Sequence, residues 1–211
     1  CFIGGGNMAH SLIGGLIDDG IEPQCIKIGE PDTMRRKKLA NNFGVIALAN
    51  NEAAVNKSDV VIFAVKPQVM KTVVVPLADL LSEKHPLLIS IAAGVTIASL
   101  ESWVGGDSAV VRAMPNTPAL INAGITGLFA NSRVLPKQRD LAESIMRAVG
   151  KTVWVEEEKL IDTVTSISGS GPAYFFYLIE ALEQAAIDGG LNKDAARLLT
   201  LETALGSARL A

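Results

Sequence analysis

The sequence has few of the residues on which metal sites, disulfide frameworks and hydrolytic triads depend. Its 211 residues include two cysteines and two histidines. Cys1 and Cys25 show neither metal-ligand spacing nor a disulfide framework, which is typical of a reducing compartment and favours the cytoplasm. His10 and His85 belong to no Ser-His-Asp order. We therefore expect no metal, and neither hydrolysis nor metal catalysis is favoured.

Strong net charge and long apolar runs are also missing. The net charge is −3, which gives no electrostatic argument for binding nucleic acid. No apolar run reaches the roughly 18 residues that a membrane span requires. We therefore expect neither nucleic acid nor a membrane among the partners of this chain.

Apolar residues, by contrast, are abundant. They make up 49% of the chain, and the mean hydropathy is +0.33, which is high for a monomer of this size. Since no segment is long enough to cross a membrane, the excess indicates an interface between subunits. The chain is long enough for a sizeable core and for one or two domains.

Short β-branched runs alternate with helical stretches from residue 1 to about residue 155. The expected strands are 2–3, 25–29, 44–47, 60–65, 87–91, 109–112, 125–130 and 152–155. The expected helices are 8–17, 31–43, 51–57, 69–81 with a break at Pro76, 96–103 and 137–149. Continuous Val and Ile runs separated by helices predict an α/β fold with a mostly parallel sheet covered on both faces, whose last strands are open to antiparallel pairing.

The chain changes character after Val155, where no further strand is evident. Expected helices cover 159–167, 173–187 and, after a cap at Asn192, the rest of the chain to Leu210. The helix 173–187 is apolar nearly all round, and two helices alone cannot bury it. We therefore expect a Rossmann-type domain at 1–155 and an all-α dimerisation domain, incomplete here, at 156–211.

A glycine-rich turn opens the chain. Phe2-Ile3 runs into Gly4-x-Gly6-x-x-Ala9, and a helical pattern follows. Such a turn presents backbone N–H groups at a helix N-terminus, where a pyrophosphate is stabilised. Because a second strand follows this helix, the pattern predicts a dinucleotide site. The expected contacts are Gly4, Gly5, Gly6, Asn7 and Met8.

Glu30 bears on the choice between NADPH and NADH. It stands at the end of the second expected strand, where an acid binds the ribose 2′-OH and repels a 2′-phosphate. Arg35 and Arg36 follow one helical turn later, within reach of that phosphate. These residues oppose one another and leave the choice of cofactor open, with Glu30 expected to lower the affinity for NADPH.

Four further motifs accompany the glycine turn: Phe63-Ala64-Val65-Lys66-Pro67, Ser90-Ile91-Ala92-Ala93-Gly94-Val95-Thr96, Arg112-Ala113-Met114-Pro115-Asn116-Thr117-Pro118 and Ser168-Gly169-Ser170-Gly171-Pro172-Ala173-Tyr174. In this order and spacing, the whole chain resembles the pyrroline-5-carboxylate reductases. The resemblance implies reduction of 1-pyrroline-5-carboxylate to L-proline by NADPH or NADH, the last step of proline synthesis. It also implies a homodimer or a ring of dimers.

The resemblance implies a set of site residues as well. Further cofactor contacts would be Asn51 at the adenine-side ribose, Ala64, Val65, Lys66 and Pro67 in one loop, and Ala92, Ala93 and Gly94 at the nicotinamide end. Substrate contacts would be Met114, Asn116, Thr117, Glu158, Ser168, Gly169, Ser170 and Gly171. Each motif also has a purely structural interpretation: a solvated lysine at Lys66, plain turns at 92–94 and 114–118, a close helix crossing at 168–171, and an acidic helix start at Glu158.

The family's remaining hallmark is a Ser-Pro-Gly-Gly-Thr-Thr-type loop, which binds the substrate carboxylate and supplies a hydroxyl near the imine. No such motif occurs up to Ala211. The catalytic residue is therefore unassigned. We expect protein ending at Ala211 to bind dinucleotide with almost no reductase activity.

Two other classes of protein share part of the pattern. A β-hydroxyacid dehydrogenase would need a basic catalytic group on the long apolar helix, but no Lys, Arg or His occurs between Pro172 and Gly190. A non-catalytic dinucleotide sensor would have no need for both the 114–118 turn and the 168–172 bend.

Overall fold

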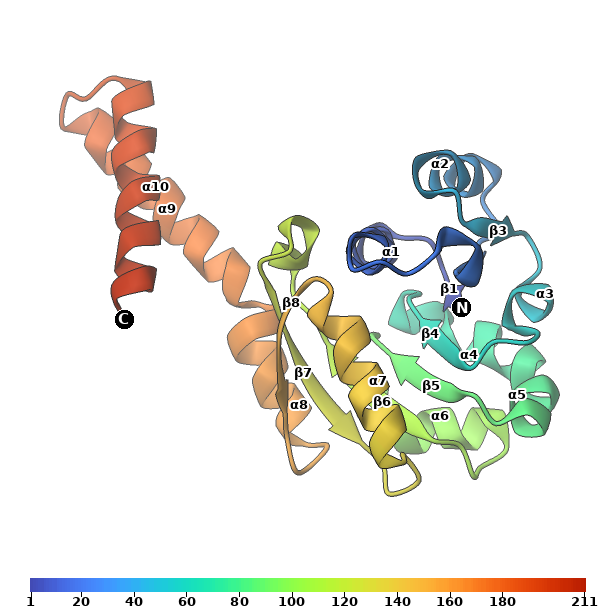
Figure 1. Ribbon diagram of the computed structural model, residues 1–211. Coiled ribbons are helices and arrows are strands. Elements are labelled where there is room, and N and C mark those ends of the chain that lie inside the picture. Colours follow the sequence, from blue (N-terminus) through green and yellow to red (C-terminus); the bar gives the residue numbers. More distant parts are fainter. The chain divides into compact units, whose positions relative to one another are not determined.

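An eight-stranded sheet organises Cys1–Gly169, the first of two compact units in the computed structural model, which describes residues 1–211. The strands are β1 (Phe2–Ile3), β2 (Lys27–Gly29), β3 (Ile46–Leu48), β4 (Val60–Phe63), β5 (Leu87–Ser90), β6 (Val110–Met114), β7 (Gly124–Ala130) and β8 (Gly150–Trp154). Their order is β3-β2-β1-β4-β5-β6-β7-β8 (Figure 1). Only β6 and β7 pair antiparallel, and β8 is parallel to β7, which confirms the mostly parallel sheet.

Helices cover both faces of this sheet. One face carries α1 (Asn7–Asp18), α2 (Thr33–Phe43) and α7 (Pro136–Arg147), and the other carries α3 (Asn51–Val55), α4 (Pro67–Val74), α5 (Ala78–Lys84) and α6 (Ile97–Val104). Alternate residues of one strand enter the two cores: Ile62 joins the first, and Val61 and Phe63 join the second. Strands buried on both faces account for the continuous Val and Ile runs.

Prolines set several of the element boundaries. Pro76 lies in the 3₁₀ segment η2 (Val75–Leu77), which separates α4 from α5 at the expected break. Pro23 opens another, η1 (Pro23–Cys25), so the second strand begins at Lys27 rather than at Cys25. A third 3₁₀ segment, η3 (Thr117–Ile121), carries Pro118 in its first turn. Proline is favoured in such first turns because an N–H group there would have no partner within the helix, so its absence costs nothing.

The segment after β8 belongs to the first unit. It forms α8 (Leu160–Val164) and a π-helix, η4 (Thr165–Gly169), where we expected one helix over 159–167. Ile161 is buried, and α8 packs against β6 and β7. Gly127 in β7 permits this approach, because a Cβ there would lie 2.5 Å from Val164 Cγ1.

The second unit, Ser170–Ala211, is a helical hairpin. It consists of α9 (Gly171–Asp188) and α10 (Lys193–Leu210), and the Asn192 side chain caps α10 by accepting the Ala195 N–H at 2.9 Å. Large apolar side chains on both helices are exposed, Phe175 and Tyr177 among them. Exposed apolar side chains occur in both units, and this short hairpin carries a large share of them. None of the helices combines the length and the apolar character that crossing a membrane requires.

Glu143 joins α7 to the edge strand β8. Its carboxylate accepts hydrogen bonds from Trp154 Nε1 at 2.8 Å and from Thr152 Oγ1 at 3.1 Å. The bond from Trp154 is the main cause that lowers the pKa of Glu143 below 4.5, its ordinary value. Arg139 stacks on the Trp154 ring, 3.8 Å from its centroid.

This lowered pKa predicts a pH-dependent contribution of Glu143 to stability. A carboxylate with a lowered folded-state pKa stabilises the fold above its unfolded-state pKa, and the effect disappears as pH falls through the folded-state value. Glu143→Gln should therefore reduce the free energy of unfolding at neutral pH, and the difference from the parent should shrink as the pH falls through the lowered folded-state pKa of Glu143. Urea denaturation at a series of pH values from neutral to acidic measures the difference. A difference that stays constant over the whole series would contradict the prediction.

Candidate dinucleotide and substrate site

A cleft of about 670 Å³ lies at the carboxyl ends of β1 and β4. These strands are neighbours, but α1 follows β1 on one face of the sheet and α4 follows β4 on the other. The loops after them diverge, and ligands of open α/β sheets bind where this happens. The lining residues are Ile3, Gly4, Gly5, Gly6, Asn7, Gly29, Glu30, Pro31, Arg35, Ala49, Asn51, Ala64, Val65, Lys66, Val69 and Val73.

The three glycines of the turn have different reasons to lack a side chain. Gly4 has φ +97°, and a Cβ there would lie 2.7 Å from the Ala64 oxygen. At Gly5 a Cβ would lie 2.5 Å from Leu39 Cδ1. Gly6 has φ −72°, and a Cβ there would meet nothing within 4 Å. Folding explains Gly4 and Gly5, whereas the space beside Gly6 is open toward a ligand.

The N-terminus of α1 is open to an anion. Gly6 offers no side-chain cap, and the first turn contains no acidic residue. The first N–H groups of a helix have no partners within it, and the helix dipole favours negative charge there. A dinucleotide pyrophosphate fits this position by charge and by shape.

Glu30 is buried and is bound to the glycine turn itself. Its Oε2 accepts the N–H of Gly5 at 2.9 Å, and its Oε1 accepts the N–H of Asp32 at 2.9 Å. Arg35 Nη1 pairs with Oε2 at 3.3 Å. The Glu30 carboxylate therefore supports the cleft as well as lining it.

The two arginines of α2 differ in their freedom. Arg36 donates to the backbone oxygens of Glu30 and Pro31 at 2.8 and 2.7 Å, and to Thr33 Oγ1 at 3.0 Å. Arg35 is exposed and lines the cleft, with Glu30 as its partner. Of the two, only Arg35 lies where a cofactor phosphate would approach the cleft.

Asn51 lines the cleft at the start of α3. Its Oδ1 is buried and has no hydrogen-bond partner. Gly29 leaves room for it, since a Cβ there would collide with that oxygen. An unpaired buried polar atom requires an explanation, and an adenine-side ribose hydroxyl in the cleft would supply a partner for the amide. The residues present thus fit a dinucleotide.

The loop after β5 lies outside this cleft. Ala92 is buried, while Ala93 and Gly94 are exposed, and Gly94 has φ +73°. Two other predicted cofactor residues do not line the cleft either: Met8 packs against the core, and Pro67 begins α4.

Four of the predicted substrate residues of the first unit form two contacting pairs, Asn116 with Ser168 and Met114 with Gly169. Asn116 accepts the N–H of Ile125 at 3.0 Å and donates to the Ser168 oxygen at 3.1 Å. Met114 packs on Gly169, where a Cβ would lie 2.7 Å from Met114 Cε. Thr117 is exposed. The structure thus brings the 114–116 segment to residues 168 and 169, while Ser170 and Gly171 begin the second unit.

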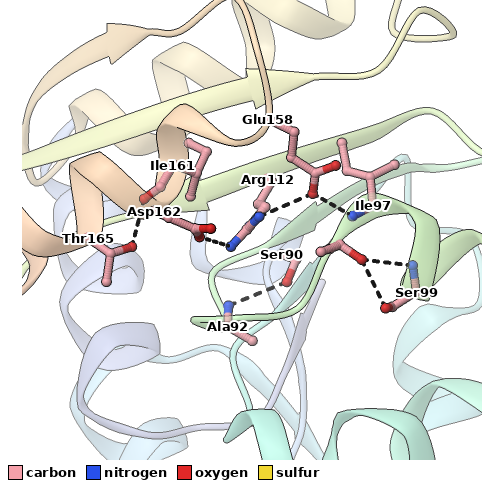
Figure 2. Close-up of polar contacts among 10 residues, drawn as sticks. Ser90, Ala92, Ile97, Ser99, Arg112, Glu158, Ile161, Asp162 and Thr165 are labelled. Atoms are coloured by element: carbon pink, nitrogen blue, oxygen red, sulfur yellow. Dashed lines mark hydrogen bonds and ion pairs between the residues drawn. The ribbon is translucent and has the colours of Figure 1, made fainter.

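Glu158 lies beside two partners that its sequence context did not indicate (Figure 2). Its Oε1 accepts the N–H of Ile97 at 2.8 Å and pairs with Arg112 Nη1 at 3.2 Å. Sequence reasoning also missed Val69 and Val73, which line the cleft from one face of α4. Their i, i+4 spacing is the signal that could have found them.

Comparisons with known proteins agree along the whole chain. A family described as NADP oxidoreductase coenzyme F420-dependent matches residues 1–94, and one described as pyrroline-5-carboxylate reductase dimerisation matches residues 158–211. The pyrroline-5-carboxylate reductase of Pseudomonas aeruginosa is 47% identical over 210 residues, covering 100% of this chain and 77% of that protein. The Glycine max enzyme is 37% identical, covering 99% and 76%.

Solved structures give the same result. A pyrroline-5-carboxylate reductase from Coxiella burnetii superposes with a TM-score of 0.95 at 48% identity, covering 100% of this chain and 78% of that one. The Plasmodium falciparum pyrroline carboxylate reductase, solved with NADP bound, gives 0.88 at 30% identity, covering 99% and 76%.

The strand order, the open α1 terminus and the cleft define a Rossmann-type dinucleotide-dependent oxidoreductase. Relatives that match the whole of this chain at up to 48% identity make the class specific: the chain belongs to the pyrroline-5-carboxylate reductase family. It is an NAD(P)H-dependent enzyme that acts on an imine, and it carries the family's dimerisation segment.

Proposed function

We propose that this chain binds NADPH or NADH across the cleft between β1 and β4 and reduces 1-pyrroline-5-carboxylate to L-proline. The observation that carries the cofactor site is the open space at Gly6 beside an uncapped helix N-terminus. The bound cofactor supplies the hydride, and the protein supplies orientation and exclusion of water.

The proposed cofactor roles follow the cleft. The first N–H groups of α1, at 7–9, hold the pyrophosphate, and Glu30 and Asn51 face the adenine-side ribose. The loop 64–67, with its backbone and Lys66, forms the opposite wall. The loop 92–94, where small residues let a ring approach the backbone, receives the nicotinamide end.

The proposed substrate roles fall to Met114, Asn116, Thr117 and residues 168–171, whereas the bonds of Glu158 to Ile97 and Arg112 favour a positioning role for Glu158 beside them. An imine that is already protonated is electrophilic, so the chain needs few acid and base side chains. The stiff 114–118 turn, with two prolines that fix φ, supports a wall of the pocket. The hydrogen bonds of Asn116 to Ile125 and Ser168 support a role for it in holding that wall.

The domain division at 155/156 is part of this proposal. The family's dimerisation segment begins at 158, whereas the compact units divide after Gly169 because α8 packs on the sheet. We further propose a homodimer or a ring of dimers built through the helical hairpin, and a cytoplasmic location, which the two free cysteines favour.

A steady-state assay of NADPH oxidation tests the function. Full-length protein should turn over with 1-pyrroline-5-carboxylate and not with β-hydroxyacids and NADP⁺. Turnover with a β-hydroxyacid would favour a dehydrogenase, and binding without any turnover would favour a dinucleotide sensor.

Glu30→Ser should change the choice of cofactor. Loss of the carboxylate removes an acceptor of the Gly5 N–H, so both cofactors should bind more weakly. It also frees Arg35 and removes a negative charge near a 2′-phosphate, so the NADPH-to-NADH ratio of kcat/KM should rise on the order of tenfold. Arg36→Lys, which alters a structural arginine, is the control and should leave this ratio unchanged. A falling ratio in Glu30→Ser would show that the acid lies away from the 2′ position.

A further inference from the structure

The N-terminus of α6 is closed, in contrast to that of α1. Thr96 caps it by accepting the N–H of Ser99 at 3.2 Å, and Glu158 Oε1 accepts the N–H of Ile97 at 2.8 Å. The carboxylate comes from 61 residues away in the sequence, just before α8. Figure 2 shows Glu158 between the guanidinium of Arg112 and the backbone of Ile97. The anion position at this helix end is thus filled from within the protein.

Arg112 is the buried partner that holds this carboxylate. It lies on β6, in register with Ser90 of β5, and only 3% of its surface is exposed. Its Nη1 pairs with Glu158 at 3.2 Å and its Nη2 with Asp162 at 3.3 Å (Figure 2). Asp162 is largely exposed, so Glu158 is the better shielded of the two partners. A buried guanidinium without a partner is strongly destabilising, which ties Glu158 firmly to β6.

The segment fixed by this arrangement is the loop between β5 and α6. At the beginning of this loop, the N–H of Ala92 lies 3.4 Å from Oγ of Ser90. Ser90 is the last residue of β5, which pairs with the strand of Arg112. At the end of the loop, Ile97 is bound to Glu158. Arg112 lies on the central sheet, and the Glu158 carboxylate connects it to the α6 end of this loop.

We infer that Arg112 is a positioning residue for hydride transfer: it holds Glu158 on the N-terminus of α6 and so fixes the loop 91–96. The inference rests on the proposed role of residues 92–94 at the nicotinamide end. Glu158 then acts through Ile97, and its bonded oxygen is not available to a substrate. The pyrophosphate and adenine half of the cofactor binds at β1 and β2 and is independent of this connection.

Glu158→Ala in the full-length protein tests the inference. With the adenine half of the site intact, the Kd for NADPH should change less than threefold, while kcat should fall at least tenfold at saturating substrate with KM unchanged. The fluorescence enhancement of bound NADPH, which reports the nicotinamide environment, should also fall. Formate should restore part of kcat, because it fits between Arg112 and the Ile97 N–H. Glu158→Gln keeps an acceptor for that N–H, so its kcat and its nicotinamide fluorescence should lie between those of the parent and of Glu158→Ala. The same measurements on Glu158→Gln test the inference if the Ala variant does not fold.

The opposite end of α6 offers a matched control. Arg133 pairs there with Glu101 at 2.8 Å and with Asp107 at 2.9 Å, another arginine between two carboxylates. Glu101→Ala should leave kcat and nicotinamide fluorescence unchanged. If it lowers kcat as much as Glu158→Ala does, the effect is general loosening of α6 and the inference is overturned.

Three other results distinguish the possible failures. Parent-like kcat and fluorescence in Glu158→Ala overturn the inference. A raised KM with normal kcat also overturns it, because Glu158 would then contact the substrate. Ala93→Leu places a large side chain in the loop itself. If it changes neither cofactor fluorescence nor kcat, the proposed role of residues 92–94 fails, and the inference fails with it.

Discussion

Gly6→Val should greatly weaken dinucleotide binding while the protein still folds. The φ of Gly6 is −72°, which any residue adopts, and an added Cβ meets no protein atom within 4 Å. The branched side chain would instead occupy the space that the pyrophosphate needs at the N-terminus of α1. The loss should be about 3 kcal/mol, or on the order of 100-fold in Kd for both NADPH and NADH. Fluorescence titration measures the Kd, and thermal unfolding of the unliganded protein measures stability.

Gly4→Val is the matched control at the same turn. Its φ of +97° is unfavourable for valine, and its Cβ would lie 2.7 Å from the Ala64 oxygen. This variant should lower the melting temperature of the unliganded protein, whereas Gly6→Val should not. If Gly6→Val binds NADPH as well as the parent, the glycine turn serves the fold alone.

Phe175→Glu should dissociate the proposed dimer. The side chain of Phe175 is 64% exposed on α9 of a single chain, within the apolar surface of the helical hairpin. A central aromatic residue at an interface contributes about 2–4 kcal/mol to association, and a buried unpaired carboxylate adds a further penalty. We expect the dimer Kd to rise by at least about 100-fold. Sedimentation velocity over a range of protein concentrations measures this change.

Met34→Glu provides the control for that experiment. Met34 is an apolar side chain on α2 of the first unit and is 76% exposed. The substitution therefore adds the same charge as Phe175→Glu at a comparably exposed apolar position outside the hairpin. It should leave the oligomeric state unchanged. A parent-like oligomer in Phe175→Glu would show that association uses another surface.

Local patterns were enough to predict the strands, the glycine turn and most helix boundaries. The strand Val60–Phe63 packs against helices on both faces of the sheet. Such a strand is recognised as a continuous apolar run, without alternating polar residues. Pro76 interrupts the helix regardless of what the helix packs against, because proline lacks the N–H that a helix interior needs. Asn192 caps α10 through its own side chain. Each of these effects acts within a few residues, so the sequence alone contains its cause.

The candidate site was predictable in part. Nine of the predicted cofactor residues line the cleft: Gly4, Gly5, Gly6, Asn7, Glu30, Asn51, Ala64, Val65 and Lys66. They follow strand ends, and the carboxyl ends of neighbouring parallel strands meet at one edge of a sheet. The sequence could not show that Glu30 would accept the N–H of Gly5, because that bond depends on how β1 and β2 are aligned.

The sequence by itself determined the class of fold, the dinucleotide turn and the family, since these depend on residue types at short, fixed spacings. Tertiary structure alone decided the partners of side chains that are distant in the chain. Arg112 meets Glu158 across 46 residues, and Asn116 meets Ser168 across 52. The physical reason is that such contacts depend on where packing places α8 and η4 against the sheet, and no local pattern encodes that geometry.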